Sequence, residues 1–162
     1  MYQATNSEIR TGIQAFGLMV LRDCGGHDGH VRTITCGFTE YGLPELICLG
    51  LPTEHIFPHM NNLFYEMVIA KNRQPGPFTT DDWFTMQMQV VEADRKLAAP
   101  FAHGTERYYR GSGKTPQYMQ MAWPDATGKF PWEPGFDEKY KVRQPNLKSG
   151  FEPRQEFSMP TL

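Results

Sequence analysis

Two runs of alternating side chains constrain the fold of this chain more than any other feature. In "WFTMQMQVVEAD", four apolar residues from Phe84 to Val90 share one face, and the polar residues between them share the other. In "PQYMQMAW", Met119, Met121 and Trp123 share a face in the same way. A period of two is the pattern of a strand with one face in a core. The chain is therefore expected to build a β-sheet.

Shorter apolar runs bounded by Gly and Pro predict the rest of the sheet, and helical spacing predicts one long helix. Asn6 or Ser7 is expected to cap a short first helix that Gly17 ends, and "HGTERYYRG" predicts another short helix. The predicted fold class is α+β, a single domain with a largely antiparallel sheet of about five strands. The expected elements are strands near residues 18–23, 31–38, 46–51, 83–92 and 117–123 and a main helix near 54–72.

The 162-residue chain divides into a domain, 1–136, and a tail, 137–162. A chain of this length can bury a core without metal or disulfides. In the tail, apolar residues are scattered among charges and the prolines at 145, 153 and 160. We expect the tail to be extended and to pack on the domain or on a partner.

Composition excludes several classes of protein. Lys and Arg number 16 against 18 Asp and Glu, for a net charge of -2, which excludes general nucleic-acid binding. No apolar run approaches the roughly 20 residues that span a bilayer, and "MYQATNSEIR" lacks the charged and apolar regions that are expected of a secretory signal. Three irregularly spaced cysteines indicate free thiols, so a cytoplasmic protein is expected. Nine methionines and 13% aromatic residues favour pockets and contact surfaces.

Three separated segments carry a family resemblance. They are "ITCGF" with "PELICLGLP", the helix residues "MNNL", and "WPDATGKFPWEP". Together they resemble the bacterial and phage family called domain of unknown function 4262, from about Ile9 to about Phe136. The positions that match its pattern are Thr35, Gly37, Pro44, Glu45, Gly50, Asn61, Trp123, Pro124, Asp125, Gly128, Phe130, Pro131 and Trp132.

Two positions depart from the family pattern. Ile34 stands where Tyr is usual, and Leu43 stands where His is common. The family has no established activity, so the resemblance implies a fold and a shared surface, and it implies no reaction.

Metal-ligating residue types occur in two places. Cys24, His27 and His30 lie close together in a Gly-rich and Asp-rich segment, but no paired CxxC or HxxxH completes a zinc site, and a plain hairpin loop explains them. His55 and His59 share a helix face, yet no Glu follows His55 and Pro58 interrupts the turn. We expect no metal at either place, and His59 is expected to make a polar contact near the helix start.

Nucleophilic and cofactor-dependent chemistry finds little support. The chain has no G-x-S-x-G elbow, and "RGSGKT" lacks the full spacing of a phosphate loop. Cys36 and Cys48 lie in predicted strands and should be inert. No cofactor is therefore expected.

A composite of polar and aromatic residues is the remaining candidate site. Such residues at strand ends supply the flat walls and fixed polar groups that a concave site needs. The alternative is structural: Asp125 holds a turn, Glu45 caps a loop, and the tryptophans close the core. The predicted ligand-binding residues are Glu45, His59, Asn61, Trp123, Asp125 and Trp132.

Three functions follow from this composite site. The first is a bacterial or phage accessory protein that binds a small aromatic or nucleotide-like molecule between the strand ends and the "WPDATGKFPWEP" loop. The alternative is an interaction or structural protein, virion-associated or homo-oligomeric, that uses its Met and aromatic surface and has no catalytic site. The third is a hydrolase that uses Glu45 and Asp125 as acid and base. The expected partner is thus a small molecule, another protein or a second copy of the chain.

Overall fold

One six-stranded sheet organises the protein, for which a computed structural model describes residues 3–23, 30–74, 76–80 and 87–150. The strand order is β1-β2-β3-β6-β5-β4, and neighbours are antiparallel except for the parallel pair β3 and β6. The predicted α+β fold with a largely antiparallel sheet is confirmed. The strands are β1 (Met19–Asp23), β2 (Arg32–Cys36), β3 (Glu45–Leu49), β4 (Phe78–Thr80), β5 (Met88–Glu92) and β6 (Tyr118–Ala122).

One long helix and several short ones complete the fold. The long helix is α2 (Thr53–Phe64), which a π-helical turn, η2 (Tyr65–Ile69), continues within the predicted range. No helix in the described part of the chain combines the length and apolar character that a bilayer crossing requires. The short helices are α1 (Asn6–Phe16), η1 (Phe38–Tyr41), α3 (Arg95–Ala98), η3 (Ala99–Phe101), α4 (His103–Tyr109) and α5 (Glu138–Lys141).

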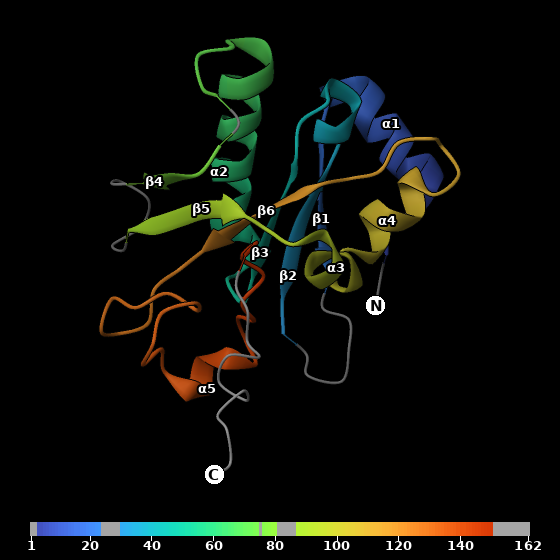
Figure 1. Cartoon of the computed structure of the whole chain (residues 1–162). Helices are drawn as coiled ribbons and strands as arrows, with labels where there is room; N and C mark the ends of the chain where they lie inside the picture. The colour runs from blue at the N-terminus through green and yellow to red at the C-terminus, as the bar shows by residue number, and fades with distance from the viewer. Residues whose placement is uncertain (1–2, 24–29, 75, 81–86, 151–162) are drawn as a thin grey trace.

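Helices cover both faces of the sheet. Figure 1 shows α2 on one side and α1 and α4 on the other. The α2 side holds the largest apolar cluster, which includes Met119, Met121 and Trp123. Tyr118, which alternates with them, belongs to the cluster on the opposite side. The alternation in "PQYMQMAW" therefore predicted correctly which side chains share a face.

Several predicted boundaries differ from the structure. The first helix is capped by Thr5, and not by Asn6 or Ser7, because Thr5 and Glu8 form a reciprocal capping box. Gly17 ends that helix as predicted. The strand predicted near 83–92 is observed from Met88 to Glu92, and residues 81–86 lie outside the described part. No pattern in the sequence predicted α3 or the three-residue β4, because both are too short to show a period.

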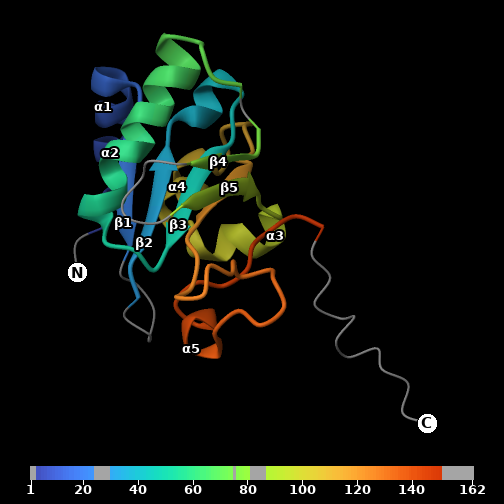
Figure 2. The same cartoon turned by 90° about the vertical axis from the view of Figure 1, so that its left-hand side faces the viewer.

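Figure 2 shows α5 beyond one end of the sheet. Two buried glutamines attach the segment from α5 to residue 150 to the sheet. The Gln144 side chain accepts a hydrogen bond from the Trp123 amide (2.9 Å) and donates one to the Trp123 carbonyl (2.8 Å). The Gln120 side chain accepts from the Leu147 amide (2.9 Å) and donates to the Pro145 carbonyl (2.9 Å). Leu147 is buried in the core, so this part of the chain packs on the domain. Residues 151–162 lie outside the described part.

We predict that Gln120→Leu loosens this attachment. The substitution leaves the Leu147 amide and the Pro145 carbonyl without their partner, which should lower the free energy of unfolding by about 2 kcal/mol. Urea unfolding measures the loss, and faster tryptic cleavage after Arg143 and Lys148 reports the local release. Gln14→Leu, at an exposed position of α1, is the control. Equal stability and equal cleavage in both variants would contradict the prediction.

Candidate functional site

Glu45, at the start of β3, is fully buried and accepts five hydrogen bonds. Its Oε1 accepts from the Thr35 hydroxyl (2.8 Å) and the Phe38 amide (3.2 Å). Its Oε2 accepts from the Gly37 amide (3.1 Å) and from the amide (2.9 Å) and hydroxyl (2.6 Å) of Thr39. All five partners are donors, which suits an ionised carboxylate. Of the two roles predicted for Glu45, this geometry is that of the loop brace.

The chain reversal between β2 and η1 brings these donors together. Gly37 has φ +142°, and a Cβ there would lie 2.7 Å from the Gly17 carbonyl, so the position requires glycine. The Thr35 hydroxyl also accepts from the Leu46 amide at 2.8 Å, which ties β3 to β2 beside the carboxylate. Local backbone conformation thus aims three consecutive amides at one side chain.

The electrostatics around Glu45 keep its neighbours neutral. Burial raises the pKa of Glu45, and hydrogen bonds, led by those from Thr39, oppose that rise. Burial and the charge of Glu45 raise the pKa values of the Cys36 thiol and the Tyr109 phenol. Burial raises the pKa of Cys48 to about 12. Cys36 and Cys48 are free thiols buried in strands, as predicted, and because a thiol reacts as its thiolate, their raised pKa disfavours reaction.

Asp125 holds the loop that follows β6. Its Oδ1 accepts from the Thr127 amide (2.9 Å) and hydroxyl (2.7 Å) and from the Lys129 amide (3.0 Å), and its Oδ2 accepts from the Asp137 amide (2.9 Å). Burial favours the neutral acid, but these hydrogen bonds outweigh it and lower the pKa of Asp125 to about 2. Asp125 is therefore an ionised brace of its loop.

The two tryptophans are engaged within the fold. Trp123 is buried and donates its indole N–H to the Leu49 carbonyl at 2.7 Å. Trp132 is half-buried and stacks on Phe130, with ring centroids 5.3 Å apart. The Lys148 ammonium lies 4.8 Å from the centroid of the Trp132 ring. Part of the Trp132 surface therefore remains accessible, whereas Trp123 is enclosed.

The structure does not bring the six predicted ligand-binding residues together. Glu45 pairs with Tyr118 at one end of the parallel strands, whereas Trp123 lies at the other end beside Leu49. Four residues of strand separate these ends by about 13 Å. Asp125 follows Trp123, so it lies at the end away from Glu45. Their joint action as acid and base therefore finds no support in the geometry.

The other two predicted residues, His59 and Asn61, lie on α2. Asn61 is exposed, and His59 is half-buried with a pKa that burial lowers. A ligand-binding role for either remains a prediction.

The predicted absence of metal in the hairpin loop also stays a prediction. Cys24 and His27 lie outside the described residues. Within the described ranges, no group of three or more His, Cys, Asp and Glu side chains is arranged to hold a metal ion.

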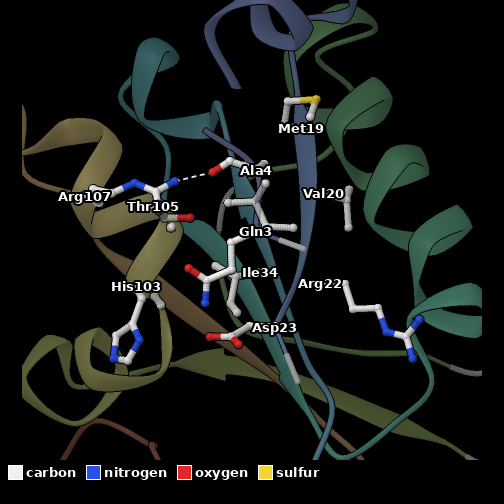
Figure 3. A pocket seen from close by; sticks show the side chains of 13 residues that line it. Gln3, Ala4, Met19, Val20, Arg22, Asp23, Ile34, His103, Thr105 and Arg107 are labelled. Atoms are coloured by element: carbon white, nitrogen blue, oxygen red, sulfur yellow. Dashed lines mark hydrogen bonds between the residues drawn. The ribbon is translucent and has the colours of Figure 1, made fainter. Parts of the chain in front are cut away.

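A cavity of about 550 Å³ lies between the β1–β2 edge of the sheet and α4, and none of the six predicted residues lines it (Figure 3). We call it the α4 cavity. Gln3 and Ala4, from the segment before α1, close one side. Six of its lining residues are apolar and form most of the wall. The full lining is Gln3, Ala4, Met19, Val20, Leu21, Arg22, Asp23, Ile34, Ala102, His103, Gly104, Thr105 and Arg107.

Specific contacts hold α4 over the sheet. A Cβ at Gly104 would lie 2.8 Å from Cδ1 of Leu21, so glycine allows helix and strand to approach closely. The buried Thr105 hydroxyl donates to the Thr35 carbonyl at 2.9 Å. Arg95, at the start of α3, makes two hydrogen bonds of 2.6 Å with the Glu106 carboxylate. One wall of the cavity is thereby fixed to both β2 and α3.

A second arginine holds Ala4 and the first residue of α1 against α4. The Arg107 Nε donates to the Asn6 side chain at 2.9 Å, and a terminal nitrogen of Arg107 donates to the Ala4 carbonyl (Figure 3). Two N–H groups of this guanidinium thus bind the N-terminal part of the chain, and Arg107 lines the cavity on that side.

Polar groups collect at one end of the cavity. Figure 3 shows the side chains of Gln3, Asp23 and His103 directed toward this end, whereas Arg22 points to the opposite side of β1. His103 is exposed and Asp23 is buried. An apolar cavity with a few polar groups at one end is the usual form of a small-molecule site.

Sequence reasoning did not identify this cavity. "HGTERYYRG" predicted only a short helix, and its residue types did not indicate which strand this helix packs against. One signal was present: Asp23 ends a strand whose residues Met19 and Leu21 lie on the same face, which places a carboxylate beside an apolar wall.

Comparison with known protein families shows a similarity over most of the chain. The model of a family described as a domain of unknown function, DUF4262, matches residues 12–137. No curated protein and no solved structure matches the chain.

We predict that Glu45→Gln destabilises the protein by about 3 kcal/mol. Gln replaces one acceptor oxygen by an NH₂ group, which would face N–H and O–H donors, so buried backbone amides would lose their acceptor. Chemical unfolding measures the loss. Glu40→Gln is the matched control: Glu40 belongs to the same turn but is exposed, and its ion pair with Lys114 (3.2 Å) should contribute at most about 1 kcal/mol. Equal losses in the two variants would show that Glu45 is no brace.

Asp125 should make stability depend on pH in the acid range. Its pKa is about 2 in the folded protein against an ordinary value of 3.8, so its stabilising effect is complete above 3.8 and is lost as the pH falls through about 2. We expect the melting temperature of the wild type to fall more steeply over this window than that of Asp125→Asn. Parallel curves for the two proteins would count against the brace. The comparison cancels the titration of other carboxylates.

Proposed function

Because the chain belongs to the family described as a domain of unknown function, DUF4262, which names no activity, we propose a function from the geometry: the protein binds a small, largely apolar molecule between β1 and α4. The observation that carries this proposal is the cavity itself. Its volume of about 550 Å³ lies within the range of roughly 300–1,000 Å³ that is typical of small-molecule sites. Its apolar walls end in a few polar groups, which can orient a ligand.

The lining favours an aromatic ligand that is neutral or carries an amino group. Met19, Leu21 and Ile34 offer apolar surface for a flat ring. Asp23 and His103 lie where hydrogen-bond donors and acceptors on the ring would meet them. The Asp23 carboxylate disfavours a phosphate, and Arg107 already makes hydrogen bonds to Ala4 and Asn6. The aromatic form of the predicted ligand is thus better supported here than the nucleotide-like form.

A protein-interaction role is the second candidate, favoured by exposed apolar side chains around the C-terminal ends of α1 and α2. Phe16 is 78% exposed and Ile69 is 60% exposed, and Tyr41 and Tyr65 are about half exposed. Exposed aromatic residues of this kind are enriched in protein interfaces. This function needs the exposed surface and not the cavity, so variants of the cavity distinguish the two.

We predict that aromatic fragments bind in the cavity and that narrowing it weakens them. Screening by thermal shift and by NMR should give fragments that move the amide signals of Leu21, Ile34 and Gly104. Ala4→Leu should weaken these fragments by about fivefold or more, because it occupies cavity volume. His103→Ala should weaken those with a polar substituent, since it removes a hydrogen-bonding group from the polar end.

Ala15→Leu, at an exposed position of α1, is the control for size and apolar character and should leave fragment affinity unchanged. If fragments bind equally well to Ala4→Leu and Ala15→Leu, or move signals only around Phe16, Tyr41 and Tyr65, the cavity is not the binding site.

A further inference from the structure

A second hollow, of about 450 Å³, lies on the α2 side of the sheet where β2 begins and β3 ends. Its lining residues come from β1, from the segments just before β2 and just after β3, from the start of α2 and from the segment after α5. Its lining is Arg22, His30, Val31, Gly50, Pro52, Glu54 and Arg143. Positive side chains outnumber the one carboxylate, which contrasts with the apolar α4 cavity.

Arg22 contributes the first guanidinium of this hollow. It is exposed, and within the described ranges no side chain or carbonyl pairs with it. Its side chain points away from the α4 cavity, to the opposite side of β1 (Figure 3). Across the strand pair it is in register with Thr33, whose hydroxyl lies 2.8 Å from that of Thr53 at the start of α2. Arg22 is therefore placed toward the hollow and is available to a ligand.

Arg143 contributes a second guanidinium, which is held in place. Its Nε donates to the Gly50 carbonyl at 2.9 Å, and its guanidinium carbon lies 5.5 Å from the centroid of the Trp123 ring. Gly50 has φ +92°, and a Cβ there would lie 2.9 Å from Cγ of Arg143. Glycine at this position lets the arginine lie across the end of β3. No acceptor within the described ranges occupies its terminal nitrogens.

We propose that this hollow binds the oxyanion group, a carboxylate or a phosphate, of a small molecule. Guanidinium groups match oxyanions in charge and in the spacing of their N–H donors. Two permanent positive charges face one exposed carboxylate, Glu54, so the local charge is positive in a protein whose net charge is -2. The site lies on the other side of the sheet from the α4 cavity and does not depend on the proposed function there.

NMR titration of the ¹⁵N-labelled chain with inorganic phosphate, and separately with acetate, tests the proposal at constant ionic strength. We expect saturable shifts of the Arg22 and Gly50 amides with at least one anion, and the stronger binder identifies the preferred oxyanion. Arg22→Gln should weaken binding by about fivefold or more. Glu54→Gln should tighten it, because it removes the repulsive charge. Arg10→Gln, an exposed arginine of α1, is the control and should change nothing.

Three results would overturn the site: no saturable shift with either anion, equal weakening by Arg22→Gln and Arg10→Gln, or no tightening by Glu54→Gln. Equal weakening would mean that the anions respond only to overall charge. Urea unfolding of Arg22→Gln should match the wild type, because Arg22 has no partner within the described ranges. His103→Ala should leave anion binding unchanged, so failure here and failure of the α4 cavity are separate results.

Discussion

The buried carboxylate of Glu45 is the interaction on which the arrangement of the sheet depends. A charge without water is stable only when hydrogen bonds replace its hydration, and Glu45 receives five of them. The donors come from the end of β2 and from η1, so the carboxylate fixes the chain reversal that delivers β3 to the middle of the sheet. Glu45 itself pairs with Tyr118, so the same residue also sets the register of the parallel pair.

The opposite end of the sheet is fastened by the same kind of contact, from side chain to backbone. Asp125 accepts hydrogen bonds from amides of its loop. The Gln144 side chain binds the backbone of Trp123, and the Gln120 side chain in β6 binds the backbone of the segment after α5. These segments lack regular hydrogen bonding, so buried polar side chains satisfy their backbone groups. The residues that looked most like a ligand site are therefore largely occupied by the fold. Two hollows lined by described residues lie at the β1 edge of the sheet, one under α4 and one beside α2.

Patterns along the chain predicted the sheet well, because the alternation of apolar and polar residues within a strand reflects which of its side chains face the core. Alternation in the last strand identified which of its side chains enter each face, and the helical period located α2. The role of Glu45 stayed open between brace and acid because three of its donors are backbone amides, which residue types do not reveal. The α4 cavity arises from the approach of Gly104 to Leu21, two residues 83 positions apart in the sequence, which no local pattern encodes.

Hydrogen exchange of the amides that bind Glu45 tests the central claim most directly. Gly37, Phe38 and Thr39 lie in a short turn that leads into a 3-10 helix, and amides in such short elements ordinarily exchange through small local openings. If the buried carboxylate holds this turn, these three amides exchange only with global unfolding, as slowly as those in the centre of β3 and β6. Exchange of the three amides that is much faster than that of β3 would contradict the account, because the turn would then open without the sheet.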